Sequence, residues 1–218
     1  MSSPALLPAA AAMQGWMYLG WACVLLFVFA RLSRGMQAGV RLMLGALVVL
    51  WCWLPGEMGA THWLGLAFQL PSVLLVVLCF RGVLVEVGRS GSGPQGVVGG
   101  ESREQTYWPG LLVLVVLGWL LLLDTVALLP FSLYAWGFTP AAAGLTTLLA
   151  LLPWLWGHGK LPGLPSVRLL ALVIAVTAVL KLPTGNVWDA WLDPWLWLAL
   201  HVFAFKKWRA RGKVRTAA

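Results

Sequence analysis

The chain has 218 residues, of which 61% are hydrophobic and 10% are charged, and its formal net charge is +8. An ordinary soluble domain carries roughly 25% charged residues, so this composition excludes a typical water-soluble protein and indicates one embedded in a membrane. In a soluble chain, the positive balance would suggest a nucleic-acid partner. In a membrane protein, the positions of the charges also determine topology.

Seven apolar segments predict an all-α, polytopic integral membrane protein with about seven transmembrane helices in a single domain, residues 1–218. Several segments approach or exceed the roughly 18 residues of a membrane-crossing helix. No basic stretch precedes the first one, so we expect a retained span rather than a cleaved signal peptide. The expected bounds are Met13 to Ala30, Val40 to Leu54, Trp63 to Phe80, Trp108 to Leu129, Ala141 to Gly157, Val167 to Leu182 and Val187 to Phe205.

The positive charges divide unevenly between the two sets of loops that these segments define. One set holds only Lys181, which leaves the other fourteen of the fifteen lysines and arginines on the opposite side. The positive-inside rule therefore places the N-terminus outside and the C-terminus in the cytoplasm. The chain has a single isoleucine and a single asparagine but many Gly, Ala, Leu, Trp and Arg residues, which is typical of a GC-rich genome. This composition favours a bacterial cell inner membrane.

Two cytoplasmic segments have distinctive compositions. Residues 82–107 are rich in Gly and Ser and predict a flexible loop. This loop has no GxxxxGK[ST] pattern, so we do not expect it to bind nucleotide. The tail, residues 206–218, contains six lysines and arginines, which favour contact with anionic lipids over contact with RNA or with an acidic patch of a partner.

Polar residues within or beside the spans gather at the predicted outer face. Asp124 lies sixteen residues along its segment from Trp108, about 24 Å at helical rise, and Gln69 lies at a comparable depth. Three further charged residues border the last two segments: Lys181, Asp189 and Asp193. One interpretation is an outward-facing polar site that binds a cation, a polar head group or a basic residue of a partner, as a substrate or ion site would. The alternative is that Asp124 pairs with Lys181, while the other residues are structural.

Local helix signals give the stretch around Asp193 a structural explanation. Asn186 is a good cap for a helix that begins at Val187, and Asp193 followed by Pro194 is a second helix-start signature. We therefore predict a short interfacial helix, Val187 to Leu192, followed by a turn or kink and a span that begins at Pro194. The tryptophans of this stretch then form an aromatic belt at the membrane interface: Trp188, Trp191, Trp195 and Trp197.

No pattern in the sequence indicates a cofactor, a metal or catalysis. The cysteines lie inside apolar runs without metal-type spacing, and the histidines are too scattered for a haem site. Two carboxylates, Asp189 and Asp193, are too few ligands to make a metal site. Neither GxSxG nor HExxH occurs. We expect no cofactor and no enzyme of a familiar class.

Three functional classes are compatible with these observations. A non-catalytic subunit or assembly factor of a larger inner-membrane complex, with other membrane-protein subunits as partners, fits the small loops and the few charges in the spans best. A small transporter or permease component would use the neighbourhood of Asp124, Gln69 and Lys181 as its site. A membrane enzyme acting on lipid-linked substrates at the outer face would use Asp189 and Asp193.

Overall fold

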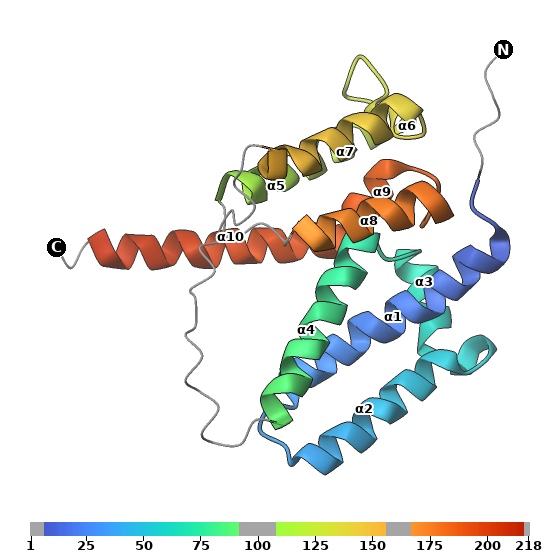
Figure 1. Ribbon diagram of the computed structural model, residues 1–218, viewed down its shortest axis with the longest axis vertical. Coiled ribbons are helices and arrows are strands. Elements are labelled where there is room, and N and C mark those ends of the chain that lie inside the picture. The colour runs from blue at the N-terminus through green and yellow to red at the C-terminus, as the bar shows by residue number, and fades with distance from the viewer. Residues whose placement is uncertain (1–6, 92–107, 156–166, 216–218) are drawn as a thin grey trace.

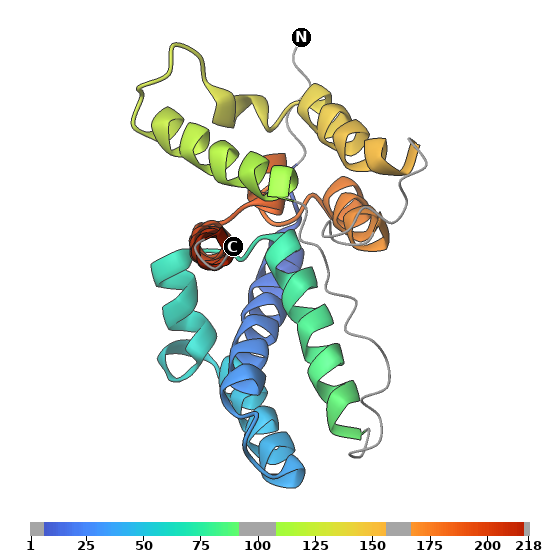
Figure 2. The same ribbon diagram turned by 90° about the vertical axis from the view of Figure 1, so that its left-hand side faces the viewer.

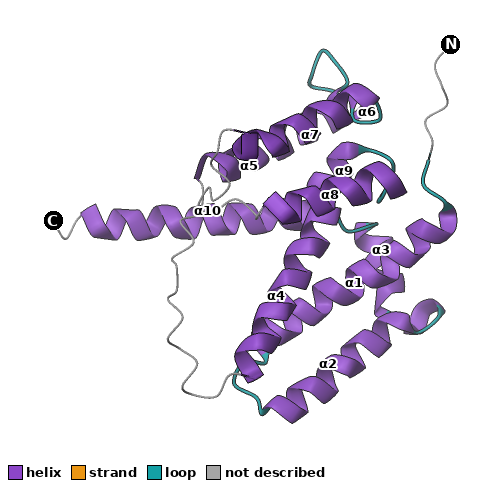
Figure 3. Cartoon of the chain, in the orientation of Figure 1, coloured by secondary structure: helices purple, strands orange, loops and turns teal. Residues whose placement is uncertain are grey.

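The computed structural model describes residues 7–91, 108–155 and 167–215, and within these ranges every regular element is helical (Figure 3). This confirms the all-helical class for the described part of the chain. The elements in order are α1 (Ala10–Leu32), α2 (Ala38–Trp53), the 3-10 turn η1 (Gly56–Met58), α3 (Ala60–Phe68), α4 (Val73–Gly91), α5 (Trp108–Thr125), α6 (Leu133–Trp136), α7 (Pro140–Leu155), α8 (Val167–Leu180), α9 (Val187–Trp191) and α10 (Pro194–Arg215).

The helices form three layers. Helices α1 to α4 make one outer layer and α5 to α7 the other, with α8, α9 and α10 between them (Figures 1 and 2). Helix α1 packs against α2 and α4, α4 and α7 both contact α8, and α5 packs along α10. The α1–α2 turn and the ends of α4 and α10 lie on one side in Figure 1, and the α2–α3 turn, α6 and the α8–α9 connection lie on the other.

The largest buried cluster lies where α4 enters the middle layer. Its side chains are aliphatic and come from α4, α8, α9, α10 and the connections on either side of α9: Val73, Leu74, Val77, Val173, Leu182, Ala190, Leu192 and Leu196. A second cluster joins α1, α2 and α3, and a third joins α7 to α9. The middle layer is therefore held to both outer layers by apolar packing.

The predicted third span, Trp63 to Phe80, is not one helix. Helix α3 ends at Phe68, and α4 begins only at Val73. Pro71 has no backbone N–H, and its ring disfavours a helical residue before it, which explains the interruption. Gln69, the residue that follows α3, has a positive φ of 60°.

One of the described helices, α1, is long and apolar enough to cross a membrane by length and composition. The apolar stretches Ala38–Trp53, Leu112–Thr125, Pro140–Leu149 and Ala171–Leu180 are shorter. Membrane association is thus compatible with the structure, and the count of seven spans stays a prediction.

The boundaries near the C-terminus follow the sequence prediction more closely. Helix α9 spans Val187–Trp191, and α10 starts at Pro194, as the two helix-start signals indicate. Helix α10 continues through the basic tail to Arg215, and α4 continues to Gly91. Residues 82–91 of the predicted loop are therefore helical, whereas residues 92–107 lie outside the described part of the chain.

Candidate functional site

A polar network joins α6 to the α8–α9 connection at the predicted outer face. The Tyr134 hydroxyl donates a hydrogen bond of 2.8 Å to Oδ2 of Asp189, and the Thr184 hydroxyl donates to the same oxygen. The backbone N–H of Asn186 in turn donates to Oγ1 of Thr184, at 3.2 Å. Asp189 is thus bound by hydroxyls of two segments that lie far apart in the sequence.

Burial and these hydroxyls act on Asp189 in opposite directions. Partial removal from water raises the pKa of the Asp189 carboxyl, and the bonds from Thr184 and Tyr134 lower it, with burial the larger effect. The same surroundings raise the pKa of Tyr134 to about 12, through burial first and then the nearby Asp189. Tyr134 therefore stays a protonated donor throughout the physiological range.

Asn186 and the backbone around Gly137 hold α9 against α6. The Asn186 side chain accepts from the Trp188 N–H at 3.0 Å, as a helix cap does, and its Nδ2 donates to the Tyr134 carbonyl at 2.9 Å. The Val187 N–H donates to the Gly137 carbonyl at 3.0 Å. A Cβ at Gly137 would collide with Oδ1 of Asn186, so this close approach requires glycine.

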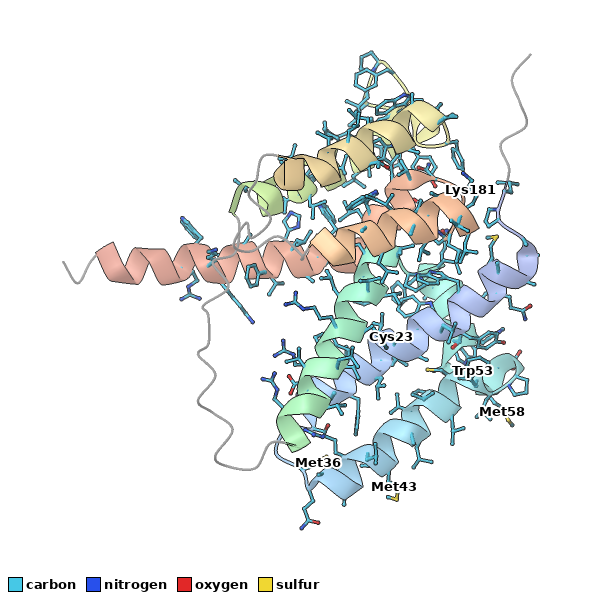
Figure 4. The ribbon with its side chains drawn as sticks, in the orientation of Figure 1. Cys23, Met36, Met43, Trp53, Met58 and Lys181 are labelled. Atoms are coloured by element: carbon cyan, nitrogen blue, oxygen red, sulfur yellow. The ribbon has the colours of Figure 1, made fainter. Side chains whose placement is uncertain are left out.

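Asp124 is bound within its own hairpin. Its Oδ2 accepts a 2.6 Å hydrogen bond from the backbone N–H of Tyr134, ten residues further along the chain. Lys181, the other half of the predicted pair, directly follows α8 and has an exposed side chain and a positive φ of 56° (Figure 4). The two ion pairs observed among the described residues involve other groups, so the structure does not contain an Asp124–Lys181 pair.

Asp193 joins the N-termini of two helices. Its Oδ1 accepts from the Leu196 N–H at 2.7 Å, which is the predicted cap of α10. Its Oδ2 accepts from the Ser72 N–H, also at 2.7 Å, at the start of α4. Both helix ends carry partial positive charge, so they stabilise the buried carboxylate although no lysine or arginine forms an ion pair with it in the described residues.

Two tryptophans of α1 bind the interruption between α3 and α4. Trp16 donates its indole N–H to the Pro71 carbonyl at 2.9 Å, and Trp21 donates to the Gln69 carbonyl at 3.0 Å. These carbonyls have no helical partner at the break, so the indoles satisfy them. Gln69 therefore contributes backbone to this region, and its side chain is exposed.

His201 belongs to an aromatic cluster between α5 and α10. Trp119 donates its indole N–H to Nε2 of His201 at 3.2 Å, and Nδ1 of His201 lies 2.8 Å from the Trp197 carbonyl. An indole nitrogen only donates, and a carbonyl only accepts, so these contacts require a neutral imidazole with its proton on Nδ1. This arrangement is that of a packed histidine.

The structure brings two of the five sequence candidates together, because Tyr134 donates its backbone N–H to Asp124 and its hydroxyl to Asp189. Asp193 is bound by other partners, among them the Ser72 amide. The side chains of Lys181 and Gln69 are exposed. In the described residues, no group of three or more His, Cys, Asp or Glu side chains is arranged to hold a metal ion. Every buried side-chain nitrogen or oxygen there has a hydrogen-bond partner.

Sequence reasoning missed the partners that bind these carboxylates. Tyr134 and Thr184 carry no helix-cap or motif signal that would have linked them to Asp189. It also missed Glu86, a buried carboxylate of α4 that pairs with Arg34 and lies 3.7 Å from Nε of Arg31. The available signal was a glutamate near the start of a segment of mixed charge, residues 82–107. No protein family, curated protein or solved structure matches this chain.

Proposed function

We propose that this chain is a membrane-embedded, non-catalytic subunit or accessory factor of a larger complex in a bacterial inner membrane. The observation that carries the proposal is the use of the candidate carboxylates within the fold. Asp124 and Asp193 accept from backbone amides, and Asp189 accepts from two hydroxyls. These bonds hold helices and turns together, so each of the three carboxylates has a structural role that requires no substrate.

The arrangement of the turns supports membrane embedding. The basic α1–α2 turn and the basic end of α10 lie on one side of the molecule, and the α2–α3 turn and α6 lie on the other (Figure 1). This is the alternation that a seven-span chain with an outer N-terminus requires. Large apolar side chains are exposed on α1, α2, α5, α7 and α10, as expected where lipid or neighbouring subunits replace water.

The test is purification of the tagged full-length chain in a mild detergent. We expect a partner protein in fixed stoichiometry that stays bound through size-exclusion chromatography. An unrelated membrane protein with the same tag, expressed at the same level, is the control. Recovery of the chain as a clean monomer would refute the subunit proposal.

The transporter alternative rests on one specific observation. Two interrupted helices, α3–α4 and α9–α10, meet where Asp193 binds Ser72. Interrupted helices at membrane depth are tolerated where they are buried in protein or line a cavity, and many secondary transporters build their sites from them. In this alternative, the carboxylate that binds the transported ion is Asp193 and not Asp124.

Proton flux into liposomes distinguishes this alternative from the subunit proposal. The purified chain is reconstituted with an internal pH-sensitive dye, and a pH gradient is imposed. A transporter that uses Asp193 should lose flux in Asp193→Asn and keep it in Asp124→Asn. A proton flux no faster than that of empty liposomes would refute the hypothesis that the isolated chain transports protons.

A further inference from the structure

The turn between α2 and α3 presents large apolar side chains outward. We call residues 51–63 the tryptophan turn. Its exposed fractions are 52% for Trp51, 53% for Trp53, 78% for Met58 and 58% for Trp63. Four neighbouring side chains of this size, left open to water, would form an adhesive patch, so the turn requires an apolar partner.

Two of the three indole donors of this turn are satisfied by its own backbone. Trp51 donates to the Met58 carbonyl at 3.0 Å, and Trp63 donates to the Glu57 carbonyl at 2.7 Å. A tryptophan at a membrane interface ordinarily directs its N–H toward polar groups outside the protein. Because these two donors are bound within the turn, neither ring needs water or a head group as a partner.

Further polar groups of the turn are also paired within it. The Thr61 hydroxyl donates to the Cys52 carbonyl at 2.8 Å. The backbone N–H of Gly59 donates to Gly56, and that of His62 donates to Gly59, each at 3.1 Å. An unpaired backbone group costs several kcal/mol in hydrocarbon, so this pairing suits the turn to a medium of low polarity.

The length of α2 argues for the same medium. Its sixteen residues span about 24 Å, whereas the hydrocarbon core of a bilayer is about 30 Å thick. If the end next to Arg34 lies at the head groups of one leaflet, the other end stops short of the opposite head groups. Between them, α2 exposes a continuous apolar face: Val40, Leu42, Met43, Leu47 and Leu50.

Glu57 limits how deeply the turn can insert. Its side chain is exposed at the tip, and a carboxylate is costly in the centre of a bilayer. The turn must therefore lie close enough to the surface for this group to reach the head groups. Aromatic rings just below the head groups and a carboxylate at their level match the layers of a phospholipid leaflet.

We propose that the tryptophan turn is a lipid-binding surface. It lies at the boundary between acyl chains and head groups, in the leaflet opposite Arg34, and the phospholipid bilayer is its partner. This inference rests on the membrane embedding in the proposed function. It adds that α2 and its turn face lipid and leaves the other helices to contact a partner subunit.

Three methionines along this surface provide matched label positions. Met36 lies in the α1–α2 turn, Met43 on the exposed face of α2 and Met58 at the tip (Figure 4). Single variants Met36→Cys, Met43→Cys and Met58→Cys of the full chain are labelled with an environment-sensitive fluorophore and reconstituted into liposomes. The wild-type chain measures background labelling of the native cysteines, of which Cys52 and Cys79 are buried.

The quenchers are phospholipids brominated either near the head group or near the chain end, and iodide in the aqueous phase. The Met58→Cys label should lose most emission with bromine near the head group and little with iodide. The Met43→Cys label should lose most with bromine near the chain end, and the Met36→Cys label most with iodide. Glu57→Cys provides a second label position at the tip if Met58→Cys does not fold.

Flotation of the liposomes separates failure of this inference from failure of the proposed function. A chain that does not float with liposomes would refute membrane embedding and this inference together. A chain that floats, but whose tip label is quenched by iodide as strongly as that at position 36, would refute the lipid-binding turn alone. Labels at 43 and 58 that no quencher reaches would show that protein covers this face, which also overturns the inference.

Discussion

The carboxylate of Asp193 accepts a hydrogen bond from the backbone N–H of Ser72, although the two residues are 121 positions apart. The same carboxylate caps α10 through the Leu196 N–H. One side chain therefore joins the beginnings of two helices in two different layers. Its loss would leave a buried donor at the start of α4 and an uncapped α10.

Replacing Asp193 with alanine should destabilise the protein substantially. The lost cap and the unpaired Ser72 amide together amount to about 2–4 kcal/mol of the free energy of unfolding. Asp193→Asn should cost less, because its remaining oxygen still accepts one bond. Thermal unfolding in detergent measures both variants against Glu57→Ala, which removes an exposed carboxylate. Equal midpoints for Asp193→Ala and the wild type would contradict this assignment.

The second prediction concerns Asp124 and Lys181, which the structure does not pair. Asp124→Ala should lower the free energy of unfolding by about 1–2 kcal/mol, because the Tyr134 amide loses its acceptor. Lys181→Ala should have little effect. In a double-mutant cycle, the coupling energy between them should be below about 0.5 kcal/mol, as for residues without shared contacts. A clearly larger coupling energy would show that Asp124 and Lys181 do form an ion pair.

Local signals made the helix starts near the C-terminus predictable, whereas long-range contacts were not predictable. Two helix starts are predicted by local capping signals, Asn186 for the first helix and Asp193 with Pro194 for the second. Both helices begin where expected. The contact of Tyr134 with Asp189 joins residues 55 apart, and no periodicity or motif specifies it. The sequence therefore predicts that these polar groups lie at one face of the molecule, but it does not predict which residues bind them.

Two errors have identifiable physical causes. The run from Trp63 to Phe80 was predicted as one helix because it is continuously apolar, and hydrophobicity alone does not indicate backbone geometry. Pro71 was the sequence signal for the interruption. The pairing of Asp124 with Lys181 followed from opposite charges at similar predicted depth. It failed because a backbone amide within the same hairpin binds the carboxylate, at less cost in chain ordering than a distant lysine.

The third prediction is a pH dependence that arises from Asp189. Burial raises its pKa in the folded state above the unfolded value of about 3.9, so the folded protein binds this proton more tightly. The resulting contribution to stability is complete below the unfolded pKa and is lost as the pH rises through the folded-state pKa. The difference in free energy of unfolding between the wild type and Asp189→Asn should therefore fall over this window.

Unfolding of both proteins at a series of pH values measures this difference, and all other carboxylates cancel in it. Tyr134→Phe is the matched variant, because it removes one donor that favours the charged carboxylate. The window should extend to higher pH in that variant. A difference between wild type and Asp189→Asn that does not change with pH would contradict the raised pKa.

The last prediction concerns the backbone of Gln69 at the interruption. Gln69 has a φ of 60° and a ψ of −138°, a backbone conformation that glycine adopts readily but that costs a residue with a side chain about 1–3 kcal/mol. The Gln69 carbonyl binds Trp21, but its side chain is exposed, so Gln69→Gly removes strain and keeps this bond. We expect Gln69→Gly to raise the free energy of unfolding by about 1 kcal/mol, after glycine's greater freedom in the unfolded chain is subtracted. Gln69→Ala retains the Cβ and should show no such gain, so equal unfolding midpoints for the two variants would indicate that the interruption is not strained.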